Sequence, residues 1–202
     1  MSCAKVAVMQ HMMTIAAAAT AVVLGGGSAA VTINNPPAPA PVEASNPMVA
    51  GAAMLPNDSI FDNAANSPEH STMMAQIKAG GLTDTLKGNG SFTIFAPTDT
   101  AYAALGKDQV SVMLSPAQAA KDARYLVVNG RWDSQKLLAA INEAGGQLKL
   151  KTLAGGTITA MMNGPTNIVL IDQKGNVADI SIYDIYQKNG VIQVIDKVVL
   201  PA

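Results

Sequence analysis

A stretch rich in β-branched and aliphatic residues lies close to the C-terminus of the chain. It follows the turn dipeptide Asn189-Gly190 and runs from Val191 to Val199 with few polar interruptions. Because both alternating sets of positions are largely apolar, we expect a strand that is covered on both faces. Such a strand needs partners, and most of residues 91–188 is expected to supply them.

Helix signals dominate the preceding part of the chain. Ser67-Pro68-Glu69 combines a capping serine, a proline at the first helical position and an acid in the first turn, so it predicts a helix start. Gly80-Gly81 predicts the end of that helix. His70, in its first turn, is predicted to be a solvated surface residue. Further helix starts are predicted at Asp58-Ser59, Thr98-Asp99, Ser115-Pro116 and Asp133-Ser134.

Strand signals alternate with these helices and then take over the second half of the chain. The late connections are too short for crossover helices, so we predict a largely antiparallel sheet. The fold class is therefore α+β, with helices first and a β-rich half after them. Strands are predicted at 92–96, 147–153, 157–162, 167–171 and 177–186, with a further apolar run at 125–128.

The N-terminus has the pattern of a secretion signal. Lys5 is followed by an apolar core from Met12 to Leu24, and Ser28-Ala29-Ala30 is a small-residue cleavage site. The apolar run of about 13 residues is short for a membrane span, which needs roughly 20. We expect residues 1–30 to be a signal peptide cut after Ala30, the alternative being an uncleaved anchor.

A proline- and alanine-rich segment follows the predicted signal peptide. Residues 31–56 contain the run Pro36-Pro37-Ala38-Pro39-Ala40-Pro41, which cannot build a helix or a central strand. We predict an extended tether here and a single folded domain over residues 57–202. The protein would then be secreted, to a periplasm or the cell exterior, without stable membrane insertion after cleavage.

Composition excludes several classes of function. A formal net charge of −1 and 4% aromatic residues give no basis for nucleic-acid binding. Cys3 is the sole cysteine, so no intrachain disulfide can form. After signal removal His70 would be the sole histidine, which excludes most zinc sites, Cys-His nucleophiles and metal centres with several histidines. We therefore predict no metal, no cofactor and no enzymatic activity.

Three stretches together resemble the motifs of the fasciclin domain family. They are Ser91–Tyr102, with the sequence SFTIFAPTDTAY, Tyr125–Arg131, with YLVVNGR, and Asn189–Pro201, with NGVIQVIDKVVLP. The resemblance covers about residues 57–202. It implies a compact β-wedge or sandwich of mostly antiparallel strands with N-terminal and inserted helices, and a role in adhesion, matrix contact or surface interactions. Together with the simple secretion signal, it indicates a secreted bacterial protein with a single fasciclin-like domain.

The resemblance also suggests binding residues. In animal members the tyrosine–histidine segment and an Asp-Ile pair before the last motif are linked to receptor contacts, which points to Tyr125 and to Asp184-Ile185 here. Leu126 and Gln193 stand where the family has histidines. The alternative for the Asp-Ile pair is structural, with Ile185 in the core and Asp184 as a corner acceptor.

Three further residues each have two alternative interpretations, one structural and one as a binding residue. Thr98 and Asp99 either hydrogen-bond the corner between a strand and a helix or bind a partner. Trp132, after the Asn129-Gly130 turn, is either an exposed recognition anchor or a core residue. Asn189 and Gly190 are predicted to be structural.

We predict a non-catalytic recognition module that binds a protein or polysaccharide of a cell surface or matrix. The alternative is a carrier of a small apolar ligand, which requires a pocket of several hundred Å³. Methionines are the residues expected to line that pocket. They are Met73, Met74, Met113, Met161 and Met162.

Overall fold

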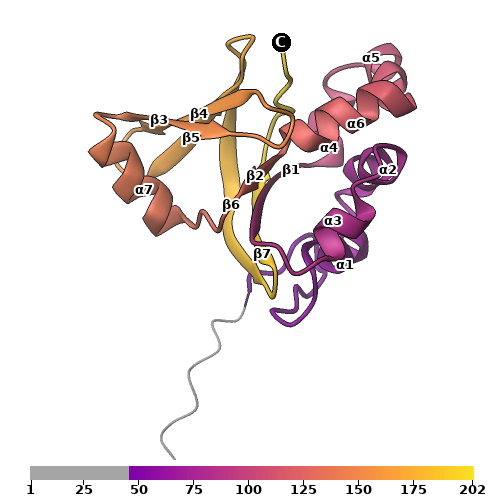
Figure 1. The fold of residues 1–202 in the computed structure, drawn as a ribbon, viewed down its shortest axis with the longest axis horizontal. Coiled ribbons are helices and arrows are strands. Elements are labelled where there is room, and N and C mark those ends of the chain that lie inside the picture. The colour runs from indigo at the N-terminus through magenta and orange to yellow at the C-terminus, as the bar shows by residue number, and fades with distance from the viewer. Residues whose placement is uncertain (1–45) are drawn as a thin grey trace, which may run out of the picture. The chain divides into compact units, whose positions relative to one another are not determined.

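The computed structural model describes residues 46–202 (Figure 1). The predicted signal peptide and the first part of the predicted tether lie outside the described residues. Residues 46–56, assigned to the tether from the sequence, contact the domain: Val49 and Met54 are buried. Asn46 exchanges two hydrogen bonds with the backbone of Tyr186, at 2.6 and 2.7 Å. The folded domain therefore extends N-terminally beyond residue 57, to Asn46.

Seven strands form one mixed sheet in the order β2-β1-β7-β6-β5-β4-β3. The first and last strands, β1 and β7, are parallel, and the other neighbouring strands are antiparallel. The predicted α+β class is confirmed. The strands are β1 (Phe92–Pro97), β2 (Val127–Asn129), β3 (Gln147–Lys151), β4 (Thr157–Asn163), β5 (Asn167–Ile171), β6 (Val177–Gln187) and β7 (Gly190–Ile195).

The two ends of this sheet approach each other. Val128 of β2 forms an antiparallel bridge with Thr152, the residue after β3. Leu153 N donates a further hydrogen bond of 2.8 Å to Val127 O. The sheet is therefore nearly closed, with β2 joined to the residues that follow β3.

The helices lie in two groups (Figure 1). One group gathers beside β1 and β7, where α2 packs on α6 and α1 on α3, whereas α7 packs on β3 and β4. The sequence patterns do not predict α5, a short helix that follows Gly106 and has no side-chain cap. The helices are α1 (Ile60–Asn66), α2 (Ser71–Ala79), α3 (Thr83–Lys87), α4 (Asp99–Ala103), α5 (Lys107–Met113), α6 (Pro116–Tyr125) and α7 (Ser134–Glu143).

The predicted start of α2 at Ser67-Pro68-Glu69 is wrong. Ser67 ends α1, and α2 begins only at Ser71. The cap comes from Asp99, whose Oδ1 accepts from Thr72 N at 2.8 Å and whose Oδ2 accepts from Ser71 N at 3.2 Å. A carboxylate distant in sequence thus replaces the local serine, because the first amides of a helix need acceptors from wherever the fold supplies them.

His70 is also not where the sequence placed it. Its side chain is 2% exposed, and its Nδ1 lies 2.8 Å from Ser67 Oγ. Burial lowers the pKa of His70, against the opposing effect of the carboxylates of Asp99 and Glu69. The prediction of a solvated surface histidine is therefore wrong, because the turn between α1 and α2 folds inward.

Asn189 and Gly190 have the structural roles that were predicted. Asn189 Oδ1 accepts from Ile60 N at 2.9 Å, and its Nδ2 donates to Leu86 O at 2.7 Å. A Cβ on Gly190 would meet Phe92 O at 1.9 Å. The parallel pairing of β1 and β7 therefore requires glycine at this position.

Candidate functional site

Two of the four predicted binding residues are buried. Tyr125 is 0% exposed and Ile185 is 1% exposed. Tyr125 Oη donates to Thr157 O at 2.7 Å, and burial raises the pKa of this phenol to about 12. Leu126 is buried beside it. Tyr125, Trp132, Asp184 and Ile185 therefore do not form one continuous exposed surface.

Asp184 lies on a β-bulge in β6. Between the pairs Ile182–Val194 and Ile185–Ile192, three steps along β6 match two along β7, so one residue is extra. Asp184 has φ = 59°, a left-handed conformation that aspartate tolerates better than most residues. The bulge redirects its carboxylate from the sheet toward the start of α7.

The carboxylate of Asp184 holds the N-terminus of α7. Its Oδ1 accepts from Ser134 N at 2.7 Å, and its Oδ2 accepts a short hydrogen bond from Ser134 Oγ. Asp133 provides the local cap, accepting from Lys136 N at 2.8 Å. The predicted role of corner acceptor is thus what the structure shows for Asp184.

Gln193, which replaces a family histidine, connects Asp184 to the loop before α7. Its Oε1 accepts from Asp184 N at 3.0 Å, while its Nε2 donates to Asp184 Oδ1 at 2.9 Å and to Trp132 O at 3.1 Å. The side chain of Gln193 is 0% exposed. A buried amide that satisfies three partners fixes their relative positions.

The loop carrying Trp132 is fixed a second time by β1. Thr93 Oγ1 accepts from Trp132 N at 2.8 Å and donates to Gly130 O at 2.7 Å. The indole itself donates from Nε1 to Asn129 O at 3.0 Å. The orientation of the ring is therefore set by hydrogen bonds on both sides of the loop.

Trp132 is neither a core residue nor fully exposed. Its side chain is half-buried and packs on the edge of the core. Lys136 Nζ lies 4.5 Å from the ring centroid, a cation–π contact. An aromatic ring that is fixed and partly open can serve as a binding platform.

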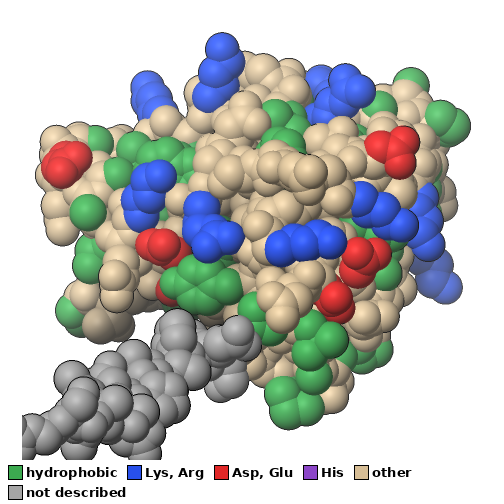
Figure 2. All heavy atoms as spheres, turned by 60° about the horizontal axis from the view of Figure 1, so that its bottom comes forward, with side chains coloured by type: hydrophobic (Ala, Val, Ile, Leu, Met, Phe, Trp, Pro, Cys, Tyr) green, Lys and Arg blue, Asp and Glu red, His purple; other side chains and the backbone are tan. Residues whose placement is uncertain are grey.

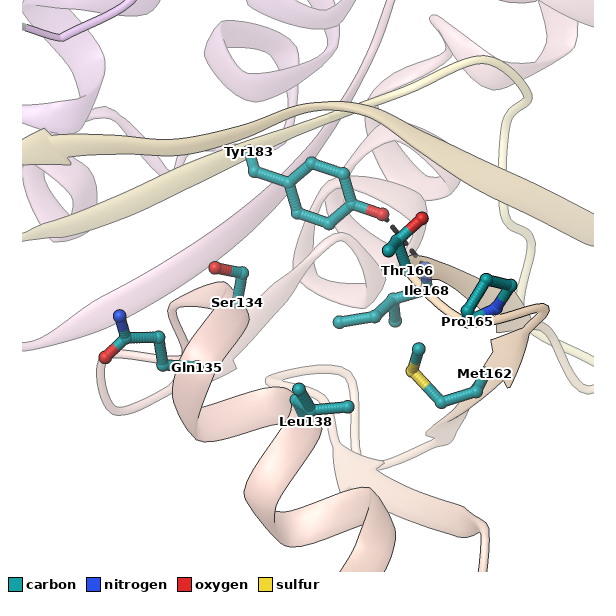
Figure 3. Close-up of a pocket in the computed structure, with 8 residues that line it drawn as sticks. All are labelled: Ser134, Gln135, Leu138, Met162, Pro165, Thr166, Ile168 and Tyr183. Carbon is teal, nitrogen blue, oxygen red and sulfur yellow. Dashed lines mark hydrogen bonds between the residues drawn. The ribbon is translucent and has the colours of Figure 1, made fainter.

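An open cleft lies between α7 and the β4–β5 hairpin, which we call the Leu138 cleft (Figure 3). Its volume is about 380 Å³. Leu138 is 40% exposed. Tyr183 Oη accepts from Ile168 N and donates to Asn167 Oδ1, both at 2.9 Å. The lining residues are Ser134, Gln135, Leu138, Met162, Pro165, Thr166, Ile168 and Tyr183.

A second open cleft, the Trp132 cleft, lies where the two ends of the sheet meet. Its volume is about 500 Å³. It is bordered on one side by Val128 and Asn129 of β2 and on the other by β3 and the residues after it, with Trp132 between them. Lys149 and Lys151, predicted to form a solvated or edge-protecting face, are exposed and line this cleft.

In residues 46–202, no group of three or more His, Cys, Asp or Glu side chains is arranged to hold a metal ion. The sequence did not predict that Lys149 and Lys151 line a cleft with Trp132, because Trp132 lies in a different segment of the chain. The lone tryptophan was the one signal that pointed to this region.

Comparison with known proteins gives a consistent result. A model of the fasciclin domain matches residues 68–201. Protein sll1483 of Synechocystis sp. is 34% identical over 158 residues, which cover 76% of this chain and 79% of that protein. Transforming growth factor-beta-induced protein ig-h3 of Sus scrofa is 29% identical over 130 residues, 64% of this chain but 17% of that protein.

Solved structures show the same fold. The FAS1 domain pair from the insect cell adhesion molecule fasciclin I aligns with a TM-score of 0.61 at 19% identity. The alignment covers 72% of this chain and 51% of that chain, so this protein matches about half of the pair. The three motifs, the topology and the nearly closed sheet therefore point to one family.

Proposed function

Because the chain belongs to the fasciclin domain family, we propose that it is a secreted, non-catalytic recognition and adhesion module. Its partner would be a protein or polysaccharide of a cell surface or matrix. The observation that carries this proposal is the fasciclin domain match over residues 68–201. Fasciclin domains occur in cell-adhesion proteins, among them the insect cell adhesion molecule fasciclin I.

The exposed groups around α7 support the same proposal. Ser134 lines the Leu138 cleft and Trp132 lines the Trp132 cleft. Both residues belong to the segment that Asp184, Gln193 and Thr93 hold by hydrogen bonds. No described helix is long and apolar enough to span a membrane. Apolar and aromatic side chains that are open to solvent and rigidly held are typical of recognition surfaces.

The test is binding of the labelled full chain, exported by its own host, to isolated cell envelopes and matrix material. Leu138→Asp should weaken binding about tenfold or more, the size expected for an interface anchor. Val112→Asp is the matched control, because Val112 is 62% exposed and lies on α5. Absence of binding to any envelope or matrix fraction would contradict the proposal.

Carriage of a small apolar ligand is the second candidate, and the Leu138 cleft is the observation that favours it. Of the methionines named from the sequence, Met162 lines this cleft, whereas Met73 and Met74 are buried in the core. Native mass spectrometry of the exported full chain is the test. A retained apolar molecule, displaced in Met162→Asp, would support carriage, and a ligand-free mass would count against it.

A further inference from the structure

The Trp132 cleft lies beside the bridge that joins the two ends of the sheet. Val128 pairs with Thr152, and Val127 O accepts from Leu153 N. Residues of β2 and of β3 line the cleft of about 500 Å³ next to this bridge. The cleft thus lies where the sheet is not fully closed.

Cations border this cleft without acidic neighbours in its lining. Lys149 and Lys151 are two residues apart on β3, so their side chains point to the same side of the strand and their Cα atoms are roughly 7 Å apart. Lys136 adds a third cation at the Trp132 ring. Among the described residues, none of those lining the cleft is Asp or Glu. Figure 2 shows one face of the domain, over which Lys and Arg side chains are spread, with acidic side chains beside several of them.

The indole of Trp132 and the backbone of β2 limit which ligands can bind in the cleft. Trp132 Nε1 already donates to Asn129 O, so the indole offers its apolar ring and not its N–H. On the side away from β1, Val127 O and Val128 are engaged by the bridge to the residues after β3. An extended peptide would therefore find little free edge on β2 with which to form a strand ladder.

We infer that the Trp132 cleft binds an anionic polysaccharide. Carboxylates of the polysaccharide pair with Lys149 and Lys151, and the apolar face of one of its sugar rings lies against the indole of Trp132. This inference rests on the proposed recognition function and names the partner class of that function. Charge pairing at an exposed site is screened by salt, so binding weakens as ionic strength rises.

Intrinsic fluorescence is the direct test, because Trp132 is the only tryptophan in the chain. The full chain is titrated with galacturonic-acid oligosaccharides and, separately, with neutral glucose oligosaccharides of equal length. The acidic oligosaccharides should give a saturable change in Trp132 emission that is lost at high salt. Poly-glutamate of similar charge is the third probe, and it should bind at least about tenfold more weakly because it lacks a ring face.

Charge reversal separates the cleft from general electrostatics. Lys149→Glu/Lys151→Glu should reduce the affinity for the acidic oligosaccharides about tenfold or more. Lys78→Glu/Lys107→Glu makes the same change in net charge at exposed positions on α2 and α5, and it should have little effect. The Trp132→Ala variant should no longer bind the acidic oligosaccharides, as measured by calorimetry. Its circular dichroism spectrum should stay unchanged.

Several results would overturn the inference. They are the absence of binding by the acidic oligosaccharides, equal binding of the neutral ones, equal binding of poly-glutamate, or equal losses in the two charge-reversal variants. The envelope-binding assay is read independently. If envelopes are bound but acidic oligosaccharides are not, this inference fails and the proposed recognition function stands.

Discussion

Asp184 and Gln193 are joined by two hydrogen bonds that run in opposite directions. The backbone N–H of Asp184 donates to Gln193 Oε1 at 3.0 Å, and Gln193 Nε2 donates to Asp184 Oδ1 at 2.9 Å. Through this pair the bulge in β6 is connected to β7 and to the start of α7. The amide thus supplies a donor and an acceptor at a position where the family has a histidine.

Replacing Gln193 with leucine should destabilise the domain by about 3 kcal/mol, because buried polar groups on Asp184 and Trp132 lose their partners. Urea unfolding of the full chain measures this change. Gln147→Leu is the control, since it is the same substitution at an exposed position in β3. Equal stability of the two variants would show that the buried amide contributes little.

Asp184 offers a way to separate backbone strain from lost hydrogen bonds. Asp184→Ala and Asp184→Gly both remove the bonds to Ser134, but only alanine places a Cβ at φ = 59°. We expect the alanine variant to be less stable than the glycine variant by about 1 kcal/mol. Urea unfolding provides the comparison.

Hydrogen exchange provides a second readout for the same two variants. The amide of Ser134 should exchange faster in both, because its acceptor on Asp184 is gone. The amide of Lys136 should keep its protection, since Asp133 still caps it. Unchanged exchange at Ser134 would contradict the capping role.

Removing the carboxylate of Asp99 should weaken the start of α2. Asp99→Ala is expected to lower the free energy of unfolding by about 1 kcal/mol, as for other helix caps. Asp108→Ala, in the exposed first turn of α5, is the matched control and should be nearly neutral. Faster exchange at the amides of Ser71 and Thr72 would locate the effect.

The contribution of Asp99 should also depend on pH. Burial acts to raise the pKa of Asp99, but hydrogen bonds from Ser71 and Thr72 outweigh it and hold the pKa below 3.8. A carboxyl with a lowered pKa in the folded state stabilises it above the unfolded-state pKa. The stability difference between the wild type and Asp99→Ala should therefore be constant near neutral pH and shrink as the pH falls through 3.8 and below.

His70 should make the domain less stable under mild acid. Its folded-state pKa lies below the ordinary value of 6.5, so below pH 6.5 the unfolded chain binds a proton that the folded chain excludes. Stability then rises with pH through this window and is constant above it. His70→Gln removes this dependence, and urea unfolding from about pH 5.5 to 7.5 checks it. Parallel profiles for the wild type and the variant would refute it.

The sequence by itself determined the elements whose signals are local. The turn at Asn189-Gly190, the apolar strand after it and the caps at Thr98 and Asp133 all follow from neighbouring residues. The motifs built on these elements were sufficient to identify the family. Local signals are reliable here because a cap or turn depends on backbone geometry over three or four residues.

Tertiary structure decided everything that depends on residues far apart in the chain. Asp99 caps α2 from another helix, so α2 starts at Ser71, and the turn before α2 buries His70. The parallel pairing of β1 and β7, the burial of Tyr125 and the meeting of Trp132 with Lys149 each join distant segments. A linear pattern records which residues are apolar or charged, but long-range pairing sets which of them share a surface.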